Sequence, residues 1–130
     1  MTSRSRDIIP DKLREILKHE GVVAIVTQNM KEPHLVNTWN SYVTITQDQR
    51  LLYPAGGMRT TEENLSKDNC VQMSFGCREV EGLRGRGAGF LIRGTASFLT
   101  SGPDFAAVKG RFPWARAAIE IRVDSATQTL

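Results

Sequence analysis

The sequence lacks long apolar runs. None of its 130 residues belongs to a run near the ~20 apolar residues that a membrane-spanning helix needs, so we expect no membrane partner. The N-terminal segment has no apolar stretch behind its arginines, so we expect no secretory signal and a cytoplasmic protein. These absences favour a globular protein that works in the cytoplasm.

Cysteine and histidine are also scarce, with two of each. Cys70 and Cys77 are seven positions apart, which puts them on opposite faces of one regular strand and prevents their pairing there. We expect both to be reduced thiols, buried or half-buried, since free cysteine behaves as a small hydrophobic residue. His19 and His34 have no Cys or carboxylate clustered with them in the sequence, so we predict no metal site.

Recognisable catalytic arrangements are missing as well. No Ser-His-Asp, Cys-His or paired-carboxylate pattern stands out, so we assign no catalytic residue. The net charge of +3 and the pI of ≈ 9.1 favour an anionic ligand but are too weak to indicate nucleic acid. The length is that of one domain, so we expect residues 1–130 to form a single domain with a flexible tail at 1–9.

The clearest pattern in the sequence is the alternation of apolar and polar residues. Val71, Met73 and Phe75 mark one face of a segment, and the same alternation returns over 90–100 and 117–124. Parallel strands would be apolar on both faces, so the pattern predicts a mainly β, antiparallel fold. We expect a six-stranded, partly closed barrel with Greek-key connections and a few short helices. The expected strands are residues 22–28, 34–46, 51–54, 70–79, 90–100 and 117–124.

Three short helices are expected between the strands. Pro10 opens the first helix, and Gly21 ends it. The second spans about 61–68, where Thr60 and Glu63 match a capping box. The third follows the fifth strand. Helices this few and short leave the sheet as the main framework of the domain.

Residues 37–42 interrupt an expected strand with four small polar side chains and two large rings. This mixture suits a flat ligand with a polar edge, because rings can lie against it while amides and hydroxyls bond its rim. A packing role for Trp39 and Tyr42 is the alternative, since such rings are commonly found in the core. The six residues are Asn37, Thr38, Trp39, Asn40, Ser41 and Tyr42.

A glycine-containing stretch after the third strand is a second candidate site. Gly56 and Gly57 let the backbone approach a ligand closely. The helix start that follows offers unpaired N–H groups and the positive end of the helix dipole, and Arg59 adds a forked cation suited to phosphate. We predict a phosphate cradle here, with an ordinary capped loop as the alternative. The stretch is Pro54, Ala55, Gly56, Gly57, Met58, Arg59, Thr60 and Thr61.

The glycine- and arginine-rich residues 84–89 resemble a dinucleotide fingerprint only superficially. The third glycine is misplaced and a strand follows where a helix is needed, so we expect a flexible hairpin loop. An RNA-contacting loop is the alternative.

Six segments, in order along the chain, match one known family. They are residues 20–25, 33–42, 56–58, 89–94, 114–118 and 128–130. In these segments the sequence resembles the small FMN-binding proteins of sulfate-reducing bacteria. That group belongs to the split-barrel flavin-binding superfamily, which includes pyridoxamine 5'-phosphate oxidase. The resemblance covers nearly the whole chain, from about Leu13 to Leu130.

The resemblance implies a homodimeric split barrel with one non-covalently bound FMN per subunit at the dimer interface. Residues 37–39 would bond and flank the flavin, 54–57 would run along it, and 59–61 would take the phosphate. Trp114 and Leu130 would come from the other subunit to cover the isoalloxazine. These roles follow from the resemblance and not from composition or spacing.

Thr60 departs from the family pattern, which has a lysine at this position. The departure removes one cation from the phosphate site, and Arg59 is the candidate replacement. We therefore expect an FMN affinity weaker than that of the family.

Electron transfer through bound FMN, with an unidentified redox partner protein, is the function that we expect. Two alternatives stay open at the level of sequence. One is an NAD(P)H:flavin oxidoreductase on the same fold. The other is a small basic barrel that binds RNA through Arg78, Arg84, Arg86 and Arg93.

Overall fold

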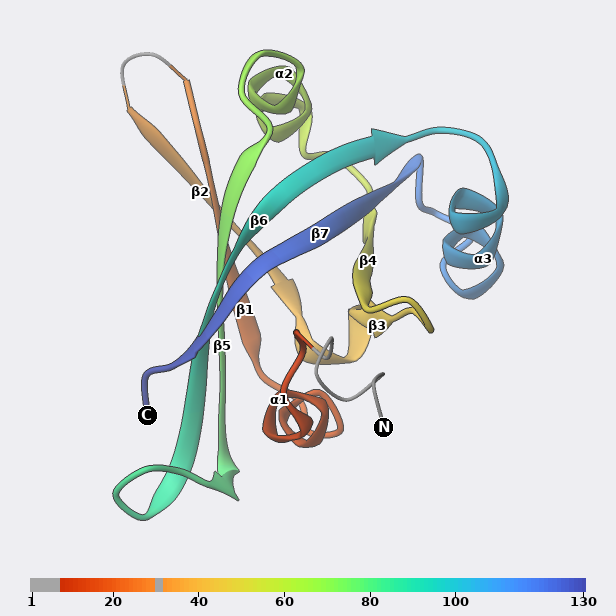
Figure 1. Cartoon of the computed structure of the whole chain (residues 1–130). Helices are drawn as coiled ribbons and strands as arrows, with labels where there is room; N and C mark the ends of the chain where they lie inside the picture. Colours follow the sequence, from red (N-terminus) through yellow and green to blue (C-terminus); the bar gives the residue numbers. More distant parts are fainter. Residues whose placement is uncertain (1–7, 30–31) are drawn as a thin grey trace.

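A computed structural model describes residues 8–29 and 32–130, and its cartoon is shown in Figure 1. The strands outnumber the helices, and the three α-helices are short, as predicted. The elements are α1 (Asp11–Ile16), β1 (Val22–Gln28), β2 (Pro33–Trp39), the 3-10 helix η2 (Asn40–Tyr42), β3 (Thr44–Ile45), β4 (Arg50–Ala55), α2 (Arg59–Lys67), β5 (Cys70–Glu81), β6 (Arg86–Leu99), α3 (Pro103–Arg111) and β7 (Ala117–Gln128).

The strands form one antiparallel sheet of seven strands in the order β2-β1-β5-β6-β7-β4-β3. The mainly β, antiparallel class is confirmed, but the strand number of six is wrong. The segment predicted as one bent strand breaks at η2 into β2 and β3, which end up at opposite edges of the sheet. Within the described residues these two edge strands do not pair, so the sheet curls without closing into a barrel (Figure 1).

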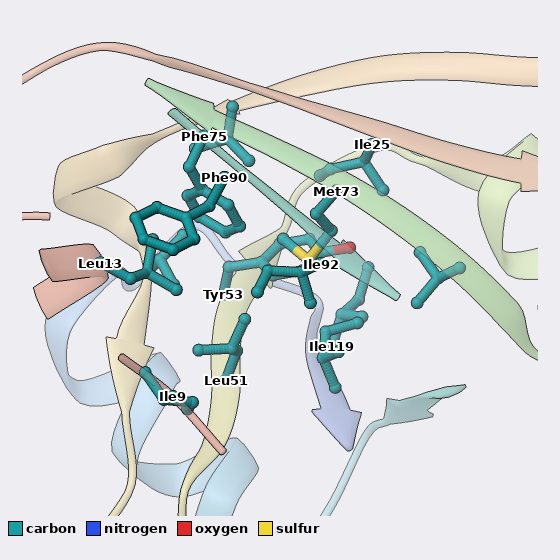
Figure 2. Close-up of a cluster of buried hydrophobic side chains, with 14 of the residues drawn as sticks. Ile9, Leu13, Ile25, Leu51, Tyr53, Met73, Phe75, Phe90, Ile92 and Ile119 are labelled. Carbon is teal, nitrogen blue, oxygen red and sulfur yellow. The ribbon is translucent and has the colours of Figure 1, made fainter. Parts of the chain in front are cut away.

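The curled sheet encloses the main core, part of which Figure 2 shows. Val71, Met73, Phe75 and Cys77 are buried on one face of β5, as the alternation predicts. Burial of such apolar side chains stabilises a fold by about 25 cal/mol per Å² of surface removed from water. The side chains labelled in Figure 2 are Ile9, Leu13, Ile25, Leu51, Tyr53, Met73, Phe75, Phe90, Ile92 and Ile119.

A smaller core lies on the other face of β4 and β7, beneath α3. Leu52 from β4 and Ala118 from β7 are buried there against Val108 of α3. Both strands are therefore buried on two faces near this helix. The sequence pattern places Glu120 on an outward face, but its side chain is only 7% exposed. That expectation is wrong because α3 covers the second face of β7.

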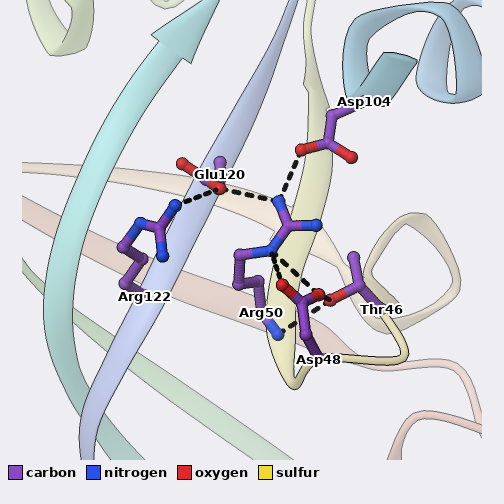
Figure 3. A network of polar contacts seen from close by, with 6 residues as sticks. All are labelled: Thr46, Asp48, Arg50, Asp104, Glu120 and Arg122. Atoms are coloured by element: carbon purple, nitrogen blue, oxygen red, sulfur yellow. Dashed lines mark hydrogen bonds and ion pairs between the residues drawn. The ribbon is translucent and has the colours of Figure 1, made fainter.

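Glu120 is buried together with a cation. Its carboxylate accepts a hydrogen bond from Arg50 Nη1 at 2.6 Å (Figure 3). The same guanidinium pairs with Asp104 of α3 and with Asp48 of the preceding turn. Paired, hydrogen-bonded charges are the form in which burial of a carboxylate is tolerated. Arg50 thus links β4, β7 and the start of α3.

Helix boundaries differ from the predictions at two places. α1 ends at Ile16, with Leu17 as its C-cap, so Gly21 is not its C-terminal stop. A Cβ at Gly21 would lie 2.8 Å from Asn40 Nδ2 and 2.9 Å from Gly76 O, so close packing explains this glycine. At α2 the N-cap is Met58 with no side-chain cap, and Thr60 lies inside the helix. The predicted capping box is therefore wrong.

The flexible tail was predicted over 1–9, and its first seven residues lie outside the described part of the chain. The N–H groups of Ile8 and Ile9 both donate to Gln49 Oε1, and Ile9 is buried in the main core. The prediction is therefore wrong for Ile9, because its side chain completes the packing around α1. In residues 8–29 and 32–130, every helix is too short or too polar to cross a bilayer.

Candidate functional site

A cavity of ≈ 390 Å³ opens between the ends of β2 and β4. Its volume lies within the range of about 300–1,000 Å³ that is usual for small-molecule sites. It brings together the two stretches that the sequence singled out. Its lining residues are Val22, Asn37, Thr38, Trp39, Tyr42, Pro54, Gly56, Gly57, Met58 and Trp114. Of these, only Val22 was not predicted.

Three rings line one side of this region. The ring centroids of Tyr42 and Trp114 are 5.8 Å apart, and Phe112 lies 4.9 Å from Tyr42 and 5.6 Å from Trp114. Arg111 of α3 ties the backbone beside these rings to α3. Its guanidinium donates hydrogen bonds to Thr44 Oγ1 and to the Ser41 carbonyl. Trp114 and Trp39 are 52% and 44% exposed, so large apolar ring faces remain available to a ligand or a second chain.

The glycine loop forms another part of the wall, next to the Trp114 ring, and Arg116 fixes it. Its Nε donates to the Gly56 carbonyl at 2.8 Å, and its Nη2 donates to the Gly57 carbonyl at 2.6 Å. Nη2 also pairs with Glu62 of α2 at 2.9 Å. The loop is thus held in place before any ligand binds. Sequence reasoning missed Arg116 because its partners are 54 to 60 positions away.

The start of α2 has two features expected of an anion site. Met58, the N-cap, has a left-handed backbone with φ 53°, a conformation that costs a non-glycine residue energy and concentrates at functional sites. Thr61 Oγ1 is buried and has no hydrogen-bond partner among the described residues. Arg59 and Thr60 are exposed on the first turn. The predicted phosphate residues therefore stand together beside the cavity, although none of the three lines it.

Two residues of the polar stretch face away from the cavity. The Asn40 side chain is fully buried, and its Nδ2 donates to the carbonyls of His19 and Gly76 at 3.0 and 3.3 Å. Ser41 bonds the exposed Glu20 carboxylate through its N–H and its hydroxyl, which lowers the pKa of Glu20. η2 turns these two side chains away from the cavity, toward β5 and the loop that joins α1 to β1.

Ala55, Trp114 and Leu130 take three different places relative to the cavity. Ala55 is fully buried in the main core, and its carbonyl accepts a hydrogen bond from the Arg116 N–H. Trp114 lines the cavity of its own chain, whereas the resemblance had placed it in the other subunit. Leu130 is absent from the cavity and lies 63% exposed beside β6, where its N–H and carbonyl pair with Gly89.

The surroundings of Cys70 and His19 also differ from those expected. Both thiols are free, but Cys70 is exposed rather than buried, and only Cys77 is buried. His19, expected to stand alone, has the Cys77 thiol and the Glu79 carboxylate within 4.8 Å. The sequence could not show this because the histidine is brought to β5 by the loop after α1.

The geometry suits a planar, partly polar ligand that carries an anionic group. Rings offer flat apolar faces, while Asn37 and Thr38 offer an amide and a hydroxyl at the rim. The N–H groups of a first helical turn have no intrahelical partner and attract anions. Two other cavities of ≈ 390 and ≈ 450 Å³ lack such rings, so chemistry rather than size distinguishes this one.

Known proteins resemble the chain over nearly its whole length. The sequence profile of the family described as pyridoxamine 5'-phosphate oxidase matches residues 9–129. An FMN-binding protein of Nitratidesulfovibrio vulgaris (strain Miyazaki F) is 54% identical over 123 residues, which are 95% of this chain and all of that protein. This relative matches the resemblance seen in the six sequence segments.

Solved structures share the fold at low sequence identity. HupZ of group A Streptococcus superposes with a TM-score of 0.75 at 19% identity, covering 92% of this chain and 93% of its own. An FMN-binding protein from Syntrophomonas wolfei superposes with a TM-score of 0.73 at 13% identity, covering 92% and 85%. Taken with the family profile and the close relative, these matches show that the chain belongs to the pyridoxamine 5'-phosphate oxidase family.

Proposed function

We propose that this protein binds FMN non-covalently in the aromatic cavity and transfers electrons through it. One observation carries the proposal: rings and polar side chains line a cavity beside a helix start with an unpartnered, buried hydroxyl. The FMN-binding relative at 54% identity supports the choice of ligand.

The first turn of α2 is the proposed phosphate site. The helix has nine residues, and its N-terminal N–H groups are suited to an anion. Thr61 Oγ1 is a buried hydroxyl in need of a partner, and the Arg59 guanidinium on the same turn supplies positive charge. Arg116 is not available for the phosphate, since it is already engaged by Glu62 and the loop carbonyls.

The chain's own residues position and shield the ligand. Arg116 and Arg111 hold two walls of the cavity in place, so little ordering is needed on binding. Bound FMN supplies the redox chemistry, and the protein sets its access and electrostatic surroundings. We assign no catalytic residue, and a separate redox protein is the proposed electron partner.

A homodimer is part of the proposal. Trp39 and Trp114 leave about half of their surface exposed at the cavity, which a second chain would cover. Leu130 is also exposed, and it lies outside the cavity of its own chain. It can therefore cover a flavin only in a second copy, as the resemblance implies.

Flavin binding is tested at Gly57, where a Cβ would meet no atom within 4 Å and the residue lines the cavity. We expect Gly57→Leu to weaken FMN binding at least tenfold while the flavin-free protein keeps its melting temperature. Gly110→Leu is the matched control, because Gly110 also has free space but lies on α3 outside the cavity. Quenching of flavin fluorescence on titration is the readout. Equal affinity in both variants would place the flavin elsewhere.

Electron transfer is separated from direct nicotinamide oxidation by rapid mixing. We expect NADH and NADPH to leave the FMN absorbance unchanged, while a reduced flavodoxin- or ferredoxin-type protein bleaches it. Bleaching by NAD(P)H at a catalytic rate would replace electron transfer with the oxidoreductase alternative and leave the flavin site intact. A colourless protein that FMN neither stabilises nor quenches would overturn the proposed function itself.

A further inference from the structure

Three metal-ligating side chains meet where the loop after α1 reaches β5. His19 comes from that loop, while Cys77 and Glu79 belong to β5. One ligand atom from each lies within 4.8 Å of the other two. The ligands of a tetrahedral zinc ion stand roughly 3.3–3.7 Å apart, given bonds of about 2.0–2.3 Å. Side-chain rotation alone can therefore close the three groups around one ion.

An irregularity in β5 creates the arrangement. The pairing of β5 with β6 shifts register between Cys77 and Glu81, which marks a bulge. Burial follows the same shift: Arg78 and Glu79 are both exposed, and Val80 is buried. Bulges re-aim side chains and are often found at functional positions. Here the thiol and the carboxylate converge, with Cys77 Sγ 3.3 Å from Glu79 Oε1.

The backbone of His19 is fixed although its side chain is exposed. Its N–H donates to the Ile16 carbonyl at 3.0 Å, and its carbonyl accepts from Asn40 Nδ2 at 3.0 Å. The imidazole thus starts from a defined position beside β5. This backbone support limits the ordering that metal binding would require.

We propose that His19, Cys77 and Glu79 form a zinc site that is separate from the flavin cavity. The nitrogen, sulfur and oxygen ligands form a set that zinc accepts, with one position left for water or a small anion. A cavity of ≈ 450 Å³, lined by Cys77, Glu79 and the C-terminal Leu130, opens beside that position in the single chain. This inference goes beyond flavin binding and does not depend on it.

Charge near the site is mixed. A thiolate and a carboxylate neutralise the two charges of the ion, and Glu20 lines the same cavity. Arg78 and Arg86 lie with Glu79 along a neighbouring cavity. Long-range attraction of cations is therefore weak here, and the affinity comes from direct bonds to sulfur and nitrogen.

The chain offers its own controls for the test, since its second cysteine, Cys70, and second histidine, His34, lie outside the cluster. We titrate the full, flavin-loaded protein, without a polyhistidine tag, with Co²⁺ and record difference spectra against the same sample before addition. We expect one equivalent of Co²⁺ to give a thiolate-to-cobalt charge-transfer band that Zn²⁺ removes by competition. Cys70→Ser and His34→Ala should keep the band.

Variants within the cluster decide the outcome. Cys77→Ser should abolish the charge-transfer band, and His19→Ala and Glu79→Gln should each weaken Co²⁺ binding at least tenfold. His19 and Glu79 are exposed, so their variants test the site without disturbing the hydrophobic core. Absence of the band, its loss in Cys70→Ser, or unchanged affinity in His19→Ala and Glu79→Gln would overturn the proposal.

Discussion

At the scale of single residues, the Asn40 amide joins segments that are far apart in the sequence. It donates to the carbonyls at the end of α1, in the loop at His19 and in β5 at Gly76. The Asn40 N–H also donates to the Gly21 carbonyl at 2.9 Å. Carbonyls buried without a donor are costly, so this side chain stabilises the contact between α1, β1 and β5.

We therefore expect Asn40→Ala to lower the free energy of unfolding by about 1–3 kcal/mol, because buried carbonyls lose their donor. Urea denaturation of the flavin-free protein measures this change. Asn37→Ala is the control, since Asn37 lines the cavity and makes one hydrogen bond, to the Val23 carbonyl. That variant should lose FMN affinity more than stability. If Asn40→Ala instead lost FMN affinity more than stability, Asn40 would belong to the ligand site.

Sequence patterns identified residue types in the site better than residue roles. Trp39, Tyr42 and Gly57 line the cavity, as expected from an aromatic, polar and glycine-rich pair of stretches. Asn40 and Ser41 belong to the same run but turn away from the cavity, because η2 rotates the chain by a helical step within it. Such a local rotation is not visible in residue types alone.

At the scale of elements, Arg116 connects the start of β7 to the glycine loop and to α2. Replacement by Gln keeps hydrogen-bonding capacity but removes the charge. Because hydrogen bonds from charged groups contribute about 1.5–3 kcal/mol, we expect Arg116→Gln to weaken FMN binding about tenfold or more. Arg122→Gln is the control, since its side chain is 67% exposed and pairs only weakly, at 3.4 Å, with Glu120. Faster proteolysis at Gly56–Gly57 should accompany the loss.

The turn between β3 and β4 should respond to acid. Hydrogen bonds from Arg50 and Thr46 lower the pKa of Asp48 from 3.8 to about 2. Since the unfolded state binds this proton more readily, the carboxylate stabilises the fold above pH 3.8, and the effect disappears as the pH falls toward about 2. Asp48→Asn should therefore flatten the acid limb of the melting-temperature profile. An unchanged acid limb would exclude Asp48 as a contributor.

The alternation of apolar and polar residues predicted the buried face correctly for strands that are covered on one face only. β5 and β6 have the predicted core faces, although β6 begins earlier, at Arg86, because the hairpin loop is shorter than expected. On β7 the outward position predicted for Glu120 is wrong, since α3 covers the second face of the strand and Arg50 neutralises the carboxylate. The alternation of residues along a strand does not show that a helix distant in the sequence packs on its second face.

At the scale of the whole molecule, the proposed homodimer leads to a prediction for Leu130. We expect the dimer to place the Leu130 side chain over the flavin of the other subunit. Leu130→Ala should then raise flavin accessibility to an iodide quencher or shift its potential, while the free energy of unfolding stays unchanged. Leu35→Ala is the control, because Leu35 on β2 is similarly exposed, at 62%, whereas the equally exposed Leu83 lines one cavity together with Leu130. An identical flavin signal in both variants would count against this dimer.

The sequence patterns predicted the fold class, but they did not predict whether the sheet closes into a barrel. The count of alternating segments and short helices led to an antiparallel, mainly β domain. The seventh strand arises because η2 divides one long segment, and β2 and β3 then take opposite edges of the sheet. Closure depends on how those edges meet in space, which hydrophobic periodicity does not specify.

The position of Asn40 between Trp39 and Tyr42 has a practical consequence for engineering. The two rings face the cavity, while the amide between them anchors the chain to α1 and β5. A designer can therefore exchange either ring to tune colour, potential or ligand preference while the unchanged Asn40 side chain keeps the backbone in place. Libraries built on this chain should randomise positions 39 and 42 and hold position 40 constant.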